Sequence, residues 1–222
     1  GDVKAIVGGR GDKSGSRTLN RATDTTRQPG STFKILAAFA PALDTAGMTL
    51  ATVQDDAPFT YSNGTPLKNY DNSYRGFTTI RYAITKSINV VTVKTLSAIS
   101  PQVGYDYLQN FGFTTLVQDD IVESLSLGGI TRGVTNLELT AAYATIADMG
   151  TYTKPRFYTR ILDHSGSVLI DNTSETHTVL KETTAFLLTS AMQDVVTVGT
   201  GGAANFGDMP IAGKTGTTTS NR

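Results

Sequence analysis

The sequence predicts an α+β fold in which a mainly helical core is accompanied by a few strands. Apolar residues recur with helical spacing through the middle of the chain, whereas β-prone runs lie at residues 3–7, 156–171 and 209–218. Of the 222 residues, 39% are hydrophobic and 17% are charged, so a packed core is available and disorder is not expected. This length suits one large domain or two small ones.

The first elements lead to a predicted helix that begins at Ser31. Residues 3–7 are apolar and β-prone and end at a pair of glycines, which predicts a strand, and the polar residues 10–30 predict a loop. Pro29 and Gly30 stop the preceding chain, and a broad apolar face follows them. This face consists of Phe33, Ile35, Leu36, Phe39 and Leu43.

Further helices are predicted by apolar periodicity and by their start and stop signals. Before them, residues 51–76 are rich in turn pairs such as Asn63-Gly64, which predicts an irregular surface excursion. Thr135 and Glu138 have the spacing of a capping box at the start of one helix. The predicted helices cover residues 78–86, 90–97, 101–111, 135–147 and 182–196.

The C-terminal part of the chain carries the remaining strand signals. Residues 156–171 predict a β-hairpin that turns at His164-Ser165-Gly166. A glycine-rich link follows at residues 199–202, and residues 209–218 predict a last strand.

Composition excludes several functional classes. The formal net charge is zero, which argues against a nucleic-acid-binding surface, because such surfaces need clustered cations. The absence of cysteine excludes disulfides, thiolate metal ligands and a cysteine nucleophile. His164 and His177 lack matched carboxylates, so we expect neither a metal site nor a cofactor. No apolar run approaches the about 20 residues of a membrane span, so we expect any anchor of a parent protein outside this chain.

Three short motifs carry the functional signal. They occur once each, in the order STFK at residues 31–34, SIN at 87–89 and KTG at 214–216. An S-x-x-K, S-x-N, K-T-G series supplies a nucleophile, a base, a proton relay and an anion-binding strand for acyl transfer through a serine ester. By chance, all three would occur in this order in on the order of 1 in 100 chains of this composition.

The first motif predicts a nucleophile and its base. Ser31 and Lys34 are three residues apart, so on a helix they share a face and the amine can reach the hydroxyl. Lys34 can act as a base if burial or a second cation, which we expect to be Lys214, lowers its pKa. The backbone N–H of Ser31 at the helix start can stabilise an oxyanion. The plain alternative is a helix cap followed by a solvated lysine.

The other two motifs predict groups that face the same cleft. Ser87 can relay a proton and Asn89 can donate to a substrate carbonyl, although both residue types are also common helix caps. Lys214 and the Thr215 hydroxyl suit a carboxylate, and Gly216 allows close approach of a ligand. The Thr217 N–H is the candidate second oxyanion donor. A phosphate-binding loop would need glycine at position 208, where the chain has aspartate.

At these motifs the sequence resembles the penicillin-binding protein transpeptidase domain, most closely that of the class A (bifunctional) peptidoglycan synthases. The matching blocks cover nearly the whole chain. They are residues 8–10 (GGR), 20–23 (NRAT), 27–34 (RQPGSTFK), 86–89 (KSIN), 127–129 (LGG), 133–135 (GVT), 137–144 (LELTAAYA) and 214–217 (KTGT).

The resemblance implies a peptidoglycan D,D-transpeptidase. Ser31 would attack the D-Ala-D-Ala bond of a stem peptide and Lys34 would accept its proton. Ser87 would pass a proton to the leaving amine, while Asn89 holds the peptide. Lys214, Thr215 and Thr217, with Gly216 between them, would recognise the terminal carboxylate. An amine of a neighbouring stem peptide then takes the acyl group, and β-lactams mimic the donor. The family also implies the extracytoplasmic face of the bacterial membrane and a membrane-anchored parent protein.

Serine β-lactamases share the three motifs, so the two activities must be separated. A class A β-lactamase needs a glutamate that activates a water for deacylation. Glu138 is explained by the capping box, and Glu123 lacks the flanking pattern that such a glutamate would have. We therefore favour slow deacylation and a transpeptidase, with a β-lactamase or a β-lactam sensor as alternatives.

The resemblance further implies that residues 1–222 are a partial domain. The family's sheet has five strands in an α/β/α sandwich with a helical subdomain. This chain begins at what resembles the second strand and ends just after the third, so other strands and a C-terminal helix are expected to be missing. Two alternatives stay open. Another chain or segment complements the sheet, which requires residues 209–218 to find a sheet partner, or the fragment is inactive by itself.

Overall fold

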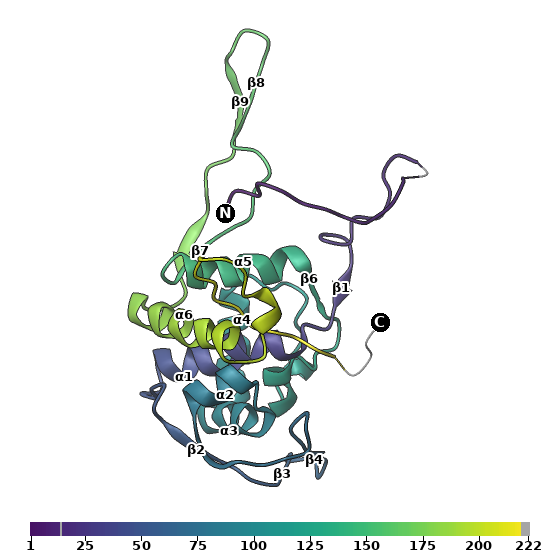
Figure 1. Cartoon of the computed structure of the whole chain (residues 1–222). Helices are drawn as coiled ribbons and strands as arrows, with labels where there is room; N and C mark the ends of the chain where they lie inside the picture. The colour runs from purple at the N-terminus through teal and green to yellow at the C-terminus, as the bar shows by residue number, and fades with distance from the viewer. Residues whose placement is uncertain (14, 219–222) are drawn as a thin grey trace.

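The computed structural model describes residues 1–13 and 15–218. They form a helical body from which one long hairpin projects, and the N-terminal residues run beside the base of that hairpin (Figure 1). The helices are η1 (Gly30–Thr32), η2 (Lys34–Phe39), α1 (Ala40–Asp44), α2 (Ile80–Lys86), α3 (Asn89–Ile99), α4 (Pro101–Asn110), η3 (Gln118–Asp120), η4 (Glu123–Leu127), α5 (Asn136–Ala147), α6 (Glu182–Thr197) and η5 (Gly202–Ala204).

The strands are short and form only isolated pairs in the described part of the chain. Within the described residues they form two-stranded antiparallel pairs and no larger sheet. The pairs are β1 (Thr26–Arg27) with β6 (Val134–Thr135), β2 (Val53–Asp56) with β5 (Gly76–Thr79), β3 (Phe59–Thr60) with β4 (Pro66–Leu67), β7 (Thr151–Thr153) with β10 (Thr176–Thr178), and β8 (Arg160–Leu162) with β9 (Val168–Asp171).

A single helical segment, residues 30–44, runs through the core. Its predicted apolar face is buried, except that Leu43 is only half-buried. The segment starts as a 3-10 turn, widens to a π turn in η2 and continues as α1. Pro41 accounts for the wide turn, because it has no N–H and its ring would clash with the carbonyl of Ala37 in a regular α-helix. The Ala40 N–H accordingly bonds to Ile35 O, five residues back.

Helix α4 packs closely on η2 because it carries a glycine at the contact. A Cβ placed on Gly104 would lie 2.5 Å from Ala37 O and 2.6 Å from Leu96 Cδ1. Any larger residue would push α4 away from the segment that carries Ser31 and Lys34. The contact with α4 therefore helps to fix this segment in the core.

The predicted helices are confirmed, with small shifts at their ends. Helix α2 begins at Ile80 rather than residue 78, because the Thr79 side chain caps it by accepting from Tyr82 N at 3.2 Å. The capping box of α5 is formed, with Glu138 N bonded to Thr135 Oγ1 at 3.2 Å. The predicted hairpin at residues 156–171 is also confirmed as β8 and β9.

Both predicted terminal strands are wrong for the described residues. At the N-terminus, Asp2 makes one parallel bridge to Arg156, but residues 3–7 are extended without a strand partner, and Val7 is 77% exposed. Residues 209–218 are also extended, and in the described chain they pair with no strand. A strand needs a neighbour to bond its backbone, and local β-propensity does not supply one. The complementation hypothesis therefore gains no support.

The excursion at residues 51–76 is more regular than predicted. It contains β2, β3 and β4 and the start of β5, with Val53 opposite Thr79 and Asp56 opposite Gly76. The turn pairs that predicted irregular chain lie between these strands. Residues 53–79 therefore contain two antiparallel strand pairs and lead directly into α2.

Candidate active site

Three chain segments meet at Gly30, immediately before Ser31. A Cβ placed on Gly30, which has φ +57°, would lie 2.6 Å from Thr217 O. A Cβ on Gly128, at φ +75°, would lie 2.5 Å from Gly30 N. Only glycine combines this backbone conformation with this approach. The glycines of the family-like blocks thus bring the 214–217 segment and the turn after η4 onto the start of the helical segment.

Lys34 is fully buried beside the 87–89 junction. Its Nζ lies 2.7 Å from Ser87 O, 3.1 Å from Ser87 Oγ and 2.6 Å from Asn89 Oδ1. Burial, and secondarily the charge of Lys214, lowers its pKa well below the usual lysine range. An amine that loses its proton this readily can act as a base. Lys214 is the second cation that the sequence predicted beside Lys34.

The Ser87 hydroxyl lies between the two lysines. Lys214 Nζ is 2.8 Å from Ser87 Oγ, on which Lys34 also converges. Burial lowers the pKa of Lys214 to about 8. Ser87 itself adopts a left-handed conformation, φ +55°, where α2 ends, and this turns its side chain between the amines. A hydroxyl that both donates and accepts, placed between two amines, can pass a proton from one to the other.

Asn89 opens α3 and is held on both sides of its amide. Its Oδ1 accepts from Lys34, and its Nδ2 donates to Lys68 O at 2.8 Å. One N–H of this amide therefore already has a protein acceptor. The structure brings Lys34, Ser87, Asn89 and Lys214 together, as the motifs predict.

The 214–217 segment is only partly arranged as predicted. The Thr215 hydroxyl lies 2.7 Å from Thr200 Oγ1, and Lys214 Nζ lies 3.0 Å from Thr215 O. A Cβ on Gly216 would lie 2.8 Å from Thr32 Cγ2, so this glycine admits the nucleophile segment itself rather than a ligand. Of the predicted carboxylate-binding residues, Thr217 alone borders the cleft that contains Ser31.

Ser31 and Asn89 line an open cleft of about 700 Å³. Ser31 is half-buried in its wall, whereas Lys34 and Ser87 are buried and do not line it. Among the hydrogen bonds of the described residues, Lys34 Nζ bonds to Ser87 and Asn89 and not to Ser31. The lining residues are Arg27, Gln28, Gly30, Ser31, Asn89, Ser124, Leu127, Gly128, Gly129, Thr217 and Thr218. The cleft thus exposes the candidate nucleophile and keeps the candidate bases away from water.

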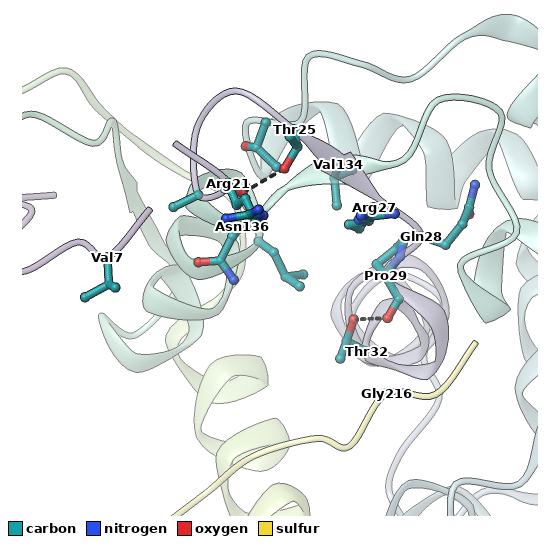
Figure 2. Close-up of a pocket in the computed structure, with 13 residues that line it drawn as sticks. Val7, Arg21, Thr25, Arg27, Gln28, Pro29, Thr32, Val134, Asn136 and Gly216 are labelled. Carbon is teal, nitrogen blue, oxygen red and sulfur yellow. Dashed lines mark hydrogen bonds between the residues drawn. The ribbon is translucent and has the colours of Figure 1, made fainter. Parts of the chain in front are cut away.

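A second cavity, of about 480 Å³, lies beside residues 27–32 (Figure 2). Figure 2 shows Arg21 and Arg27 at this cavity, with the Thr32 hydroxyl bonded to Pro29 O at 2.7 Å and Gly216 close by. Ser31 does not line it. The chemistry of the three motifs therefore belongs to the first cleft.

Two supporting residues lie in blocks that match the family, but the sequence analysis gave them no role. Gln28 pairs with the backbone of Ile130, accepting from its N–H at 3.1 Å and donating to its carbonyl, and so fixes the cleft wall. The Tyr143 hydroxyl donates to Thr32 O at 2.8 Å, and burial raises its pKa. A third residue, Asn69, gave no sequence signal beyond its place in a turn-rich region.

Neither candidate glutamate borders the cleft. Glu123 accepts from Ser62 N at 2.8 Å, and Glu138 accepts from Thr114 and Thr135. His177 Nε2 lies 2.8 Å from Asn110 O, away from the cleft. In residues 1–13 and 15–218, no group of His, Cys, Asp or Glu is arranged to hold a metal ion.

Comparison with known proteins agrees with this geometry. The family model "Penicillin binding protein transpeptidase domain" matches residues 1–222. Penicillin-binding protein 1A of Clostridium acetobutylicum is 39% identical over 98% of this chain, which spans 28% of that protein's length. Penicillin-binding protein 1F of Bacillus subtilis is 39% identical over 98% of this chain and 29% of its own length.

Solved structures show the same fold. Penicillin-binding protein 1A of Haemophilus influenzae superposes with a TM-score of 0.79 at 26% identity, covering 91% of this chain and 36% of that one. Penicillin-binding protein 3 of Mycobacterium tuberculosis gives a TM-score of 0.79 at 26% identity, covering 92% and 51%. These matches confirm the α+β fold class and the class A resemblance. The chain belongs to the penicillin-binding protein transpeptidase domain family.

Proposed function

We propose that this chain carries the acyl-transfer site of a peptidoglycan D,D-transpeptidase and that β-lactams acylate Ser31. One observation carries the proposal. Two amines with lowered pKa values converge on the Ser87 hydroxyl, and Asn89, which binds one of them, lines the same open cleft as the half-buried Ser31. This arrangement supplies the nucleophile, base and relay that a serine ester mechanism needs.

The proposed reaction has two stages. In the first, Ser31 Oγ attacks the carbonyl carbon of the penultimate D-alanine, and its proton passes to Lys34 Nζ. A proton then moves through Ser87 to the departing D-alanine amine as the peptide bond breaks. In the second stage, an amine from a neighbouring stem peptide attacks the ester carbonyl, the bond to Ser31 Oγ breaks as the new amide forms, and the proton that the amine loses passes to Ser31 Oγ.

Two further groups of contacts complete the proposal. The backbone N–H groups of Ser31 and Thr217 stabilise the oxyanion, and Asn89 holds the peptide. Lys214, Thr215 and Thr217 receive the terminal carboxylate of the donor, and Thr215 must first release Thr200 to do so. The names of the relatives support penicillin as a ligand.

We place the site at the extracytoplasmic face of a bacterial membrane, where stem peptides are crosslinked, as part of a membrane-anchored protein. In the part of the chain that the structure describes, no helix is long and apolar enough to cross a membrane.

One observation favours a second candidate, a chain that is inactive by itself. Residues 209–218 carry the KTG motif but pair with no described strand, so nothing within the described chain holds them rigidly as part of a sheet. Gly213 N bonds to Met192 O at 3.2 Å and supplies one anchor. A β-lactamase is not favoured, because Glu123 and Glu138 are engaged away from the cleft.

Intact mass after incubation with penicillin tests the proposal, with Ser31→Ala as the control. A stable adduct of one drug molecule that the variant lacks would establish Ser31 as the nucleophile and slow deacylation. An adduct that disappears within minutes would instead indicate a β-lactamase. No adduct on this chain, together with an adduct on a longer form that includes further residues, would favour the second candidate.

A further inference from the structure

Asn69 binds the start of α3 from a distant part of the chain. Its Oδ1 accepts from Asn89 N at 2.9 Å and from Val90 N at 3.2 Å. The first N–H groups of a helix have no partner within the helix, and a preceding polar side chain normally supplies one. Here the cap position is Ile88, whose side chain cannot accept a hydrogen bond. Asn69, 20 residues upstream of Asn89, performs this task instead.

The other end of the Asn69 amide is equally occupied. Its Nδ2 donates to Asp56 Oδ1 at 2.7 Å and to Ser73 O at 2.8 Å. Asn69 is 2% exposed and Asp56 is fully buried. The acceptor end faces two N–H groups and the donor end faces two oxygens, so the amide has one satisfactory orientation.

Asp56 is in turn fixed within its own strand pair. Its Oδ2 accepts from Arg75 N at 3.0 Å and lies 3.7 Å from Arg75 Nη1. A buried carboxylate with these partners holds its neighbour firmly, because moving away would leave the charge without its hydrogen bonds. The chain of contacts therefore runs from the β2–β5 pair through Asn69 to the first residue of α3.

That first residue is Asn89, which binds the Lys34 amine. The segment at residues 68–69 holds Asn89 twice, through Asn69 on its backbone N–H and through Lys68 O on its side chain. Asn89 Oδ1 lies 2.6 Å from Lys34 Nζ. A shift at the start of α3 would thus move the group that orients the candidate base.

We propose that Asn69, locked by Asp56, is a positioning residue for acylation of Ser31. It touches neither the substrate cleft nor Ser31, and it acts by fixing Asn89 and, through Asn89, the Lys34 amine. This inference rests on the proposed function. It goes further by assigning a task to the excursion at residues 53–79, which none of the three motifs includes.

The test compares Asn69→Ala with the exchange variant Asp56→Asn/Asn69→Asp in the whole chain. The exchange keeps a donor–acceptor pair between the two positions and leaves an acceptor facing Asn89 N, where a negative charge also suits a helix start. It gives up the N–H that Asn69 donates to Ser73 O. Asn63→Ala is the matched control, because Asn63 accepts from Thr65 N in the exposed β3–β4 turn of the same excursion. Two quantities are measured, the rate constant of labelling by a fluorescent penicillin and the hydrogen exchange of the Asn89 and Val90 amides.

We expect Asn69→Ala to lower the acylation rate by about 10- to 100-fold, the scale of a misplaced catalytic group, and to speed exchange of both amides. The exchange variant should recover slow amide exchange and most of the rate, and Asn63→Ala should change neither. If Asn69→Ala does not fold, the exchange variant decides alone, and slow labelling despite restored amide protection would overturn the proposal. So would a folded Asn69→Ala with normal labelling and protection.

The two hypotheses fail in different ways. If the wild-type chain is not labelled at Ser31, the proposed function fails. The Asn89 and Val90 amides then still decide the positioning claim, because their exchange needs no catalysis. Unchanged hydrogen exchange of these amides in Asn69→Ala would reject that claim, whether or not penicillin labels Ser31.

Discussion

The two lysines of the candidate site differ in how strongly the fold opposes their protonation. Lys34 has no contact with solvent, and both burial and Lys214 oppose its protonation, whereas Lys214 is lowered by burial alone, to a pKa of about 8. This favours loss of the proton from Lys34 before Lys214. The difference in burial therefore supports the proposed roles of Lys34 as base and Lys214 as cation.

The pH dependence of acylation should reflect both groups. The rate should rise with pH as Lys34 loses its proton and should fall above pH about 8 as Lys214 loses its charge. Lys214→Arg keeps the charge and should move the fall to higher pH. Lys214→Gln removes a neighbouring cation, so it should raise the pKa of Lys34 and move the rising limb to higher pH. Penicillin labelling rates between pH 5 and about 10 measure this, and a flat profile would contradict it.

Loss of the base itself should be more severe. Lys34→Met keeps an apolar stem of similar length, but it removes the proton acceptor, so labelling should slow by about 10²- to 10⁴-fold. Circular dichroism and a melting curve check that the variant is folded. A folded Lys34→Met that is labelled at the wild-type rate would show that the Ser31 proton goes elsewhere.

Sequence reasoning predicted that Lys34, Ser87, Asn89 and Lys214 lie together, which their contacts show, but it did not predict the residue that supports them. Ser31, Lys34, Ser87, Asn89 and Lys214 lie in short motifs whose chemistry can be read from residue type and spacing. Asn69 contributes through backbone N–H groups that are distant in sequence, and nothing in its neighbourhood marks this contact. The exact use of Thr215, whose hydroxyl faces Thr200, was likewise not predictable from the motif.

At the scale of elements, the packing of α4 on η2 keeps the nucleophile segment in place. Gly104 is the residue on which this packing depends, since its missing side chain leaves room for Ala37 O. Gly104→Ala should destabilise the fold by about 1–3 kcal/mol, the usual cost of overpacking a core. Urea unfolding measures the change.

Gly202→Ala is the matched control for this prediction. Gly202 also lies in a helical turn, η5, but a Cβ placed there meets no atom within 4 Å. Its free energy of unfolding should change by less than about 0.5 kcal/mol. Equal effects of the two substitutions would mean that the α4–η2 contact does not limit stability.

Helices were predictable from sequence at this scale, and the terminal strands were not. Capping residues and apolar periodicity are local, so α2, α5 and α6 appear within a few residues of their predicted limits. A strand depends on a partner that local sequence does not specify, and residues 3–7 and 209–218 find none in the described chain. The short pairs β2–β5 and β3–β4 were missed because turn residues outnumber apolar ones around them.

For the whole molecule, the projecting β8–β9 hairpin lies at the opposite end from α3, which begins at Asn89 of the candidate site (Figure 1). Its strands expose apolar side chains such as Ile161 and Leu169, and two-stranded hairpins have little stability of their own. Replacing residues 160–171 by a short glycine-rich turn should leave the penicillin labelling rate within about twofold. The free energy of unfolding should change by less than about 1 kcal/mol.

The deletion leaves the base of the hairpin intact. Arg156 Nε bonds to Asp2 Oδ1 at 2.7 Å and its Nη1 donates to Asn172 O, so this junction ties the N-terminal residues to the body. A variant that keeps Arg156 and Asn172 should retain the N-terminal contact. A large loss of labelling in this variant would show that the hairpin communicates with the cleft.

The crowding of Gly30 between Gly128 and Thr217 bears on how such a protein could evolve drug resistance. A side chain at either glycine would separate the segments that form the cleft, and natural substrate and drug would be lost together. Few substitutions beside the candidate nucleophile can therefore be selected under β-lactams. We expect tolerated escape substitutions at the cleft positions Arg27, which is exposed, and Ser124, which is half-buried.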